Sequence, residues 1–305
     1  MKKGITITVL VLTLILIIVL AYAIVLFIHY PEYASSKKDV DGTGKAITNE
    51  VTVMSYNVRC FVPFGDFFGK SWFSRAESVL SVIEQEDPDI IGFQEITPIH
   101  ERYLKKHLKG YAFIVSYRDK QLLSEGVMIA YRTEMFDEES SGMFWLSETP
   151  AKMSKGWDAQ MYRVAAYVNL VRKTDGKRVA FYDTHLDHIG EQARINGMRL
   201  MSDRIKADAP DCAFVVGDMN DYDDSAMYQN ALTSGLADAM VVAQSVSAPH
   251  GCTYQGYGTE LDSRRIDYCF LSSDITVTEY HVNETGADTG VYPSDHFPII
   301  VKTVL

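Results

Sequence analysis

Cysteine is scarce in this chain, and the few cysteines that occur are far apart. Cys60, Cys212, Cys252 and Cys269 form no Cys-x-x-Cys pair and lack the dense, even spacing of a disulfide scaffold. A structural zinc site built from thiolates requires such spacing, so we do not expect one. We interpret these residues mainly as buried thiols, from which no cellular compartment follows.

Basic residues are also in short supply. The chain contains 29 Lys and Arg against 40 Asp and Glu, a formal net charge of −11 at pH 7. A protein that binds duplex nucleic acid over a broad surface needs an excess of positive charge to neutralise the phosphates. The composition therefore argues against a broad basic face, although a local cationic groove is compatible with it.

Charged residues are missing altogether from one long N-terminal stretch. Residues 5–28 consist of apolar and uncharged side chains, and at about 1.5 Å per residue they are long enough to cross a hydrocarbon core of about 30 Å. We predict an N-terminal tail and transmembrane helix over residues 1–29, with residues 5–28 in the lipid bilayer. A cleaved signal peptide is the alternative, because residues 21–23 read Ala-Tyr-Ala, but the apolar run continues beyond them.

The predicted anchor determines the expected location of the rest of the chain. Lys2 and Lys3 favour a cytoplasmic N-terminus, although Lys37 and Lys38 beyond the apolar run weaken the bias. We therefore predict a single-pass protein of the cell membrane whose globular part lies outside the cytoplasm.

The remaining chain divides by composition into a short linker and one large domain. Residues 30–49 are polar, contain Pro, Ser and Gly, and show no periodicity, which is typical of a tether. Residues 50–305 contain no repeat and no low-complexity tract, and apolar runs typical of strands continue almost to the end. We predict one domain over residues 50–305 rather than two.

Within that domain, strand and helix patterns alternate. Residues 51–57, 88–96 and 212–218 have the composition of buried strands, while residues 74–86 and 191–208 place apolar side chains on one helical face. Other β-rich runs follow one another with no helix between them, which indicates neighbouring antiparallel strands. The expected fold class is α/β (α+β) with mixed sheets. The remaining runs expected to form strands are 111–118, 126–132, 162–171, 177–186, 264–271, 275–282 and 296–305.

Polar side chains recur where these predicted strands begin or end. Ligands in layered sheet proteins gather where strand ends converge, and polar groups buried there must be hydrogen-bonded or bound to metal. Carboxylate and amide oxygens without thiolates suit Mg²⁺ or Mn²⁺ better than zinc. The residues in question are Asn57, Glu95, Asp183, His185, Asp218, Asn220, Asp267, Asp295 and His296.

These residues carry a family resemblance. In order, the segments MSYNVRC, PDIIGFQEI, FYDTHLD, VVGDMND, RRIDYCF and YPSDHFPI resemble the motif set of the endonuclease/exonuclease/phosphatase superfamily, whose members are similar to pancreatic deoxyribonuclease. The resemblance covers residues 51–301. It implies a four-layer sandwich of two packed mixed β-sheets flanked by helices, and a catalytic domain that hydrolyses phosphate esters with a divalent metal.

The resemblance also implies a role for each residue. Glu95 would hold Mg²⁺ or Mn²⁺, assisted by Asn57 and Asp295. Asp218 would orient or deprotonate the attacking water, and Asn220 would donate a hydrogen bond to a phosphoryl oxygen.

Two histidines complete the expected site. His296, oriented by Asp267, would accept a proton or contact the phosphate. His185, paired with Glu125, would stabilise the developing negative charge. Which histidine or aspartate acts as the base stays open, and Asp267 could instead pair with Arg264 or Arg265.

One departure from the family pattern concerns charge. The family commonly has Asn where this chain has Asp183, which places a further negative charge near the expected metal centre.

Several functions remain compatible with these residues. The preferred one is a membrane-anchored, metal-dependent phosphodiesterase or phosphatase acting on nucleic acid, a phospholipid head group or a small phosphoester. A surface nuclease and a sphingomyelinase-like or phosphoinositide-directed enzyme are narrower versions, and a catalytically inactive binding module is an alternative from another class. We infer no protein partner.

Overall fold

The computed structural model describes residues 2–62, 66, 69–261 and 264–305, apart from some side chains of the first helix. Two extended sets of strands form its centre. The strands of the first set are β2 (Glu50–Asn57), β3 (Ile90–Ile96), β5 (Tyr111–Tyr117), β6 (Gly126–Arg132), β12 (Val246–Ser247), β14 (Thr276–Val282) and β15 (Ile299–Val304). The strands of the second set are β7 (Phe136–Trp145), β8 (Val164–Arg172), β9 (Arg178–His185), β10 (Cys212–Asp218), β11 (Leu236–Asp238) and β13 (Asp267–Ser272).

Both sets are mixed sheets. In the described part of the chain, the first is a seven-stranded sheet in the order β12-β14-β15-β2-β3-β6-β5, and the second is a six-stranded sheet in the order β11-β13-β10-β9-β8-β7. Strands β2 and β3 are parallel, as are β9 and β10, whereas β5 and β6 pair antiparallel, as do β8 and β9. The antiparallel neighbours expected from consecutive β-rich runs are thus confirmed.

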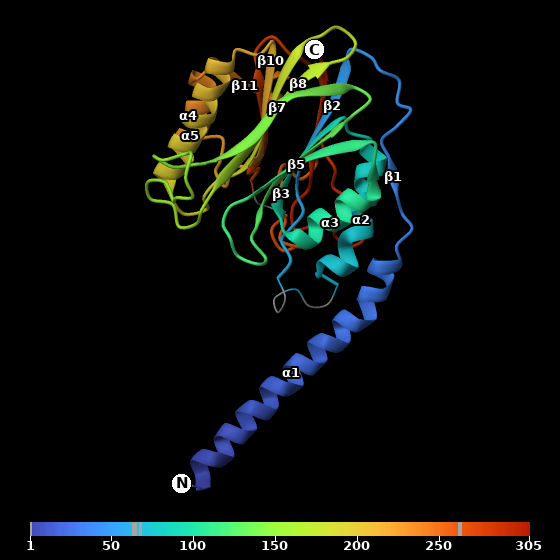
Figure 1. Cartoon of the computed structure of the whole chain (residues 1–305), viewed down its shortest axis with the longest axis vertical. Coiled ribbons are helices and arrows are strands. Elements are labelled where there is room, and N and C mark those ends of the chain that lie inside the picture. Colours follow the sequence, from blue (N-terminus) through green and yellow to red (C-terminus); the bar gives the residue numbers. More distant parts are fainter. Residues whose placement is uncertain (1, 63–65, 67–68, 262–263) are drawn as a thin grey trace.

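Helices cover the outer faces of the two sheets (Figure 1). On the seven-stranded sheet lie α2 (Trp72–Glu86) and α3 (Pro98–His107), and on the six-stranded sheet lie α4 (Glu191–Asp208) and α5 (Ala226–Thr233). The remaining short elements are β1 (Val40–Asp41), β4 (Leu108–Lys109) and α6 (Ala239–Val242). The result is a four-layer α/β sandwich.

The alternation of side chains along β2 shows how the layers are built. Val51 and Val53 point into the core between the two sheets, while Met54 and Tyr56 pack into the core under α2 and α3. Successive side chains of a strand point to opposite faces, so a strand that is apolar on both faces suits a central layer.

The predicted apolar stripe of α2 is confirmed. Ala76, Val79, Leu80 and Ile83 are all buried against the seven-stranded sheet. Each fully buried large aliphatic side chain contributes roughly 1.5–3 kcal/mol to the transfer free energy that favours folding.

The first helix lies mostly outside the sandwich. Helix α1 (Lys2–Ser35) projects away from it, and its last turns lie beside α2 (Figure 1). There the ring of Tyr33 stacks on Tyr103 with centroids 4.6 Å apart and meets Phe73 edge-on at 4.8 Å. The helix thus continues into the segment expected to be a linker, and Val40 of the same segment is buried in the core under α2.

The predicted transmembrane helix is wrong. Among the residues that the structure describes, no helix combines the length and the apolar character that crossing a bilayer requires. The expected contact of residues 5–28 with lipid and the single-pass location in the cell membrane depended on that helix, and both are corrected with it.

A glycine allows the close approach of β9 and β10 next to the strand ends. Gly217 has a φ of +146°, and a Cβ atom there would lie 1.9 Å from the carbonyl oxygen of Thr184. A side chain at this position would push the two parallel strands apart.

We therefore expect Gly217→Ala to lower the free energy of unfolding by about 2 kcal/mol or more, because overpacking and backbone strain add. Urea denaturation followed by circular dichroism measures this. Gly176→Ala is the control, since Gly176 also has a positive φ (+75°) but no atom within 4 Å of its added Cβ, and should lose only about 1 kcal/mol. Equal losses in the two variants would contradict the steric explanation.

Candidate active site

Strand register brings three polar residues of the six-stranded sheet side by side. In β9, β10 and β13, Asp218 is the direct partner of His185 on one side and of Asp267 on the other. The Nε2 atom of His185 lies 3.5 Å from Oδ2 of Asp218. Three residues separated in the sequence thus share one end of the sheet because of backbone pairing alone.

A bulge aims Glu95 at the same region from the other sheet. The pairing of β3 with β6 shifts between Gln94 and Ile96, so Glu95 is the extra residue, and its φ is +62°. Such bulges redirect a side chain at a cost of the order of 1–3 kcal/mol for the unusual backbone conformation. The carboxylate of Glu95 accepts a hydrogen bond from the backbone N–H of Cys60 at 2.7 Å, which favours its ionised form.

Asn57, at the end of β2, links the two sheets. Its Nδ2 atom donates to Oε1 of Glu95 at 3.2 Å and to Oδ2 of Asp218 at 3.0 Å. Its Oδ1 atom accepts from the backbone N–H of Arg59 at 3.0 Å. The buried amide therefore holds two carboxylates close to each other.

His296 and Asp267 form the predicted pair. Nδ1 of His296 lies 2.9 Å from Oδ2 of Asp267. Burial opposes the charge on the imidazole, but the carboxylates of Asp267 and then Asp218 outweigh it and raise the pKa of His296 to about 10. His296 is therefore a cation at neutral pH, and Arg264 and Arg265 are not its competitors for Asp267. Those arginines pair instead with Asp223, Asp224 and Asp238.

Asp218 is surrounded by other ionisable groups. Burial and then the charge of Asp267 raise its pKa to about 7, although His296 acts in the opposite direction. A carboxyl group with such a pKa can accept a proton near neutral pH far better than an ordinary aspartate.

Asp295 is also buried, and burial raises its pKa. Its Oδ2 atom lies 3.4 Å from the guanidinium of Arg59.

These groups line one cleft of about 490 Å³. Its walls combine carboxylates, imidazoles and guanidinium groups with the apolar side chains of Met161 and Ile266. The lining residues are Arg59, Cys60, Glu95, Arg118, Glu125, Met161, Arg163, His185, His188, Asp218, Asn220, Tyr254, Ile266, Asp295 and His296. Asn57 and Asp267 do not line the cleft but contact its lining residues Asp218 and His296, respectively.

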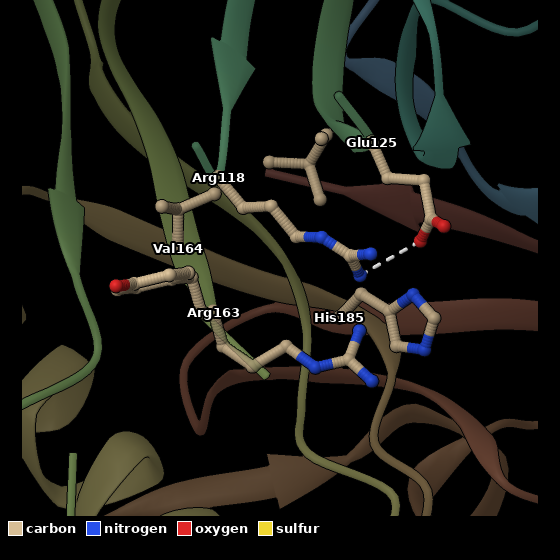
Figure 2. Close-up of a pocket in the computed structure, with 8 residues that line it drawn as sticks. Arg118, Glu125, Arg163, Val164 and His185 are labelled. Atoms are coloured by element: carbon tan, nitrogen blue, oxygen red, sulfur yellow. Dashed lines mark ion pairs between the residues drawn. The ribbon is translucent and has the colours of Figure 1, made fainter. Parts of the chain in front are cut away.

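Glu125 lies in the cleft but has a different partner from the one expected. Its Oε2 atom forms an ion pair with Arg118 at 2.8 Å (Figure 2). The carboxylate beside His185 is that of Asp218 instead. Burial and then the charge of Arg163 lower the pKa of His185 well below its usual value, so its imidazole is neutral.

The side-chain amide of Asn220 uses one of its N–H groups in a hydrogen bond. Its Nδ2 atom donates to the carbonyl of Leu186 at 3.0 Å, and its backbone N–H donates to Oδ1 of Asp218 at 3.0 Å. Because an amide nitrogen carries two hydrogens, one N–H of Asn220 is still able to meet an anion in the cleft.

Arg75 of α2 fixes the loops that carry part of the site. This side chain is 2% exposed, and its guanidinium donates to the carbonyls of Val58, Arg59, Lys70 and Pro293. The first two follow Asn57, and Pro293 precedes Asp295 and His296. One buried cation thereby ties the end of β2 to the loop before β15.

Asp183 is buried and does not line the cleft. Its side chain is buried between the sheets, where Oδ1 accepts from Nε2 of Gln94 at 2.6 Å. Burial raises its pKa well above the usual value, which favours the neutral acid. Burial thus opposes the further negative charge expected near the metal centre.

Sequence reasoning missed the arginines of the cleft. Arg59, Arg118 and Arg163 each lie just outside a strand, and in a chain with few basic residues their position beside strand ends was the available signal. Their long side chains reach the cleft from three different elements, which no spacing rule describes.

Two groups of residues have the chemistry to hold a divalent cation. Asp218, Asp267 and His296 have ligand atoms within 4.8 Å of one another. The set expected from the sequence, Asn57, Glu95 and Asp295, offers oxygen atoms only, as Mg²⁺ prefers. In both cases carboxylates crowd into a buried space where a dication would offset their repulsion, so the residues fit such a metal.

The fold is that of a class of phosphate-ester hydrolases, and comparison with known proteins places the chain in one family of that class. The sequence model of the endonuclease/exonuclease/phosphatase family matches residues 54–296, and the chain belongs to that family. Its members are phosphoester hydrolases and generally depend on a divalent metal, so the predicted enzyme class is confirmed.

Solved structures agree with this assignment. A family protein from Bacteroides vulgatus is 27% identical with a TM-score of 0.79, over 84% of this chain and 99% of that one. A mannosyl-6-phosphatase of Bacteroides thetaiotaomicron is 31% identical with a TM-score of 0.76, over 84% of this chain and 100% of that one.

A relative is also found by sequence. This uncharacterized protein of Acanthamoeba polyphaga mimivirus is 27% identical over 125 residues, which are 38% of this chain and 46% of that protein's length.

The raised pKa of Asp183 predicts how the stability of the folded protein depends on pH. Because its pKa is raised in the folded state, its stabilising contribution is complete below the pKa of the unfolded chain, about 3.9, and is lost as the pH rises through the folded value. Asn has the shape of the neutral acid and no proton to lose. Asp183→Asn should therefore become more stable than wild type as the pH rises.

We expect equal stability near pH 4 and an advantage of roughly 1 kcal/mol or more for Asp183→Asn at pH 8. Thermal denaturation at both pH values measures the difference. An advantage that stays constant with pH would show that ionisation of Asp183 is not its cause.

Proposed function

We propose that this chain hydrolyses phosphate esters with Mg²⁺ or Mn²⁺ held by Glu95, Asp295 and Asn57. The observation that carries the proposal is the presence, in one cleft, of oxygen ligands beside the charged His296–Asp267 pair and a carboxyl group with a pKa of about 7. A bound dication would polarise a phosphoryl oxygen as a Lewis acid.

The preference for Glu95, Asp295 and Asn57 over the alternative group is chemical. His296 already shares its Nδ1 with Asp267 at 2.9 Å, and its Nε2 is a nitrogen donor that Mg²⁺ disfavours. In this proposal the orientation of the Asn57 amide reverses so that its oxygen faces the metal, which a side-chain flip allows.

The other residues carry out the transfer. Asp218 takes a proton from a water molecule, whose oxygen forms the new bond to phosphorus while the ester P–O bond breaks and the leaving oxygen gains a proton from solvent. His296, held as a cation by Asp267, stabilises the charge that develops on the phosphoryl oxygens. The free N–H of Asn220 and the imidazole of His185 hold the phosphate from the adjacent wall.

One similar structure and the size of the cleft support a small substrate. The likeness to a mannosyl-6-phosphatase makes phosphorylated sugars the first natural compounds to screen. A cleft of about 490 Å³ has the size of typical small-ligand sites, which measure about 300–1,000 Å³.

The catalytic assignment is tested with Glu95→Gln and His296→Ala in the full chain. Each should lower kcat/KM for an aryl phosphate ester by about 100-fold or more, because one loses a metal ligand and the other a cation at the phosphate. Excess EDTA should abolish the activity of the wild type, and Mg²⁺ or Mn²⁺ should restore it.

Glu139→Gln is the matched control, since Glu139 is exposed and pairs with Arg178 outside the cleft. It should keep wild-type activity, and all variants should show cooperative thermal unfolding. Activity that survives Glu95→Gln or His296→Ala would refute the assigned roles.

A further inference from the structure

The cleft has a second, cationic wall that the proposed chemistry does not use. Arg118 follows β5 and Arg163 precedes β8, and their guanidinium groups both point toward the imidazole of His185 (Figure 2). The carboxylates proposed to hold the metal lie in the same cleft. A phosphate beside His185 would therefore share the cleft with the oxygen ligands of a metal and with guanidinium groups.

Among the described residues, Arg163 forms only a long ion pair with a carboxylate. The side chain is 7% exposed, and its ion pair with Asp187 is long, at 3.7 Å. Asp187 is occupied by other donors, because its oxygens accept hydrogen bonds from several backbone N–H groups of the two loops around it. Nε of Arg163 is buried without a hydrogen-bond partner, and its Nη2 lies 3.3 Å from Nδ1 of His188.

A buried cation beside another cation is unfavourable unless an anion joins them. Burial and then the charge of Arg118 lower the pKa of Arg163. Glu125 forms a close ion pair with Arg118 at 2.8 Å, whereas Arg163 has only the longer ion pair with Asp187 at 3.7 Å. Guanidinium groups match the oxygens of a phosphate in charge and in geometry.

The number of phosphate oxygens distinguishes possible substrates. A phosphomonoester presents three non-bridging oxygens and about −1.5 to −2 charge at pH 7, like a phosphorylated side chain. A phosphodiester presents two such oxygens and a single charge. When one oxygen faces the metal ligands, a monoester still offers two to the guanidinium wall, whereas a diester offers one.

We propose that Arg163, assisted by Arg118, binds the non-bridging oxygens of a terminal phosphate and makes the enzyme selective for phosphomonoesters over phosphodiesters. This inference rests on the proposed function, because it concerns the same cleft and the same phosphoryl group. It adds the substrate class and a specificity-determining residue to that function.

The test compares p-nitrophenyl phosphate with bis(p-nitrophenyl) phosphate, using the full chain with Mg²⁺ or Mn²⁺. The wild type should prefer the monoester by about tenfold or more in kcat/KM. Arg163→Met should lower kcat/KM for the monoester by about 100-fold, the usual effect of losing a charged hydrogen bond, and for the diester by less than about tenfold. Arg163→Lys should recover part of the loss.

Arg178→Met is the matched control, because Arg178 lies outside the cleft and pairs with Glu139. It should leave both activities and their ratio unchanged. A wild type that prefers the diester, or an Arg163→Met variant that loses both activities equally, would overturn the inference while leaving the proposed function standing.

Binding of inorganic phosphate provides a readout that does not depend on turnover. In EDTA, phosphate should raise the melting temperature of the wild type and of Arg178→Met but not that of Arg163→Met. An undiminished shift in Arg163→Met would overturn the inference. Absence of any hydrolysis by the wild type would instead count against the proposed function, and the phosphate shift would still decide the role of Arg163.

Discussion

The register of β9, β10 and β13 is the constraint on which the site depends. Backbone hydrogen bonds align Asp218 with His185 and Asp267, so these side chains converge without any need for attraction between them. Since two of the three are carboxyl groups, the alignment is electrostatically unfavourable, and burial increases that cost. The stability of the surrounding sheets holds them there. Gly217 belongs to the same arrangement, because only a residue without a side chain permits the approach of β10 to β9 at this point.

The crowded charges explain the chemistry that the cleft can perform. Asp267 keeps His296 protonated, and the same negative surroundings keep Asp218 near a pKa of 7, so a cation and a proton acceptor coexist in one buried space. Environments that drive the pKa values of neighbouring groups apart are typical of sites that need an acid and a base at the same pH. Arg163 and Arg118 line the same cleft and supply positive charge. The cleft therefore combines carboxylates that suit a dication with guanidinium groups that suit a phosphate.

The sequence was informative wherever an apolar strand ended in a polar residue. The neighbouring residues were enough to place four site residues at strand ends, namely Asn57, Glu95, His185 and Asp218. The order of the motifs identified Asp267 and His296 as further site residues. Strand β7 was missed because its segment Phe136–Trp145 forms a sheet edge whose first half is polar and largely exposed, so it lacks the composition of a buried strand. The partner of Glu125 and the arginine wall depend on long side chains that meet across elements, which local patterns do not encode. The transmembrane prediction relied on apolar length alone, and the structure does not support it.

The location of a bound metal tests this account most directly. Manganese gives an anomalous X-ray signal, so crystals of the full chain grown with Mn²⁺ would show the ion without reference to activity. We expect one Mn²⁺ in the cleft with a carboxylate oxygen of Glu95 at about 2.1 Å, the usual distance for a small hard dication. A Mn²⁺ bound instead by Asp218, Asp267 and His296, or outside the cleft, would contradict it.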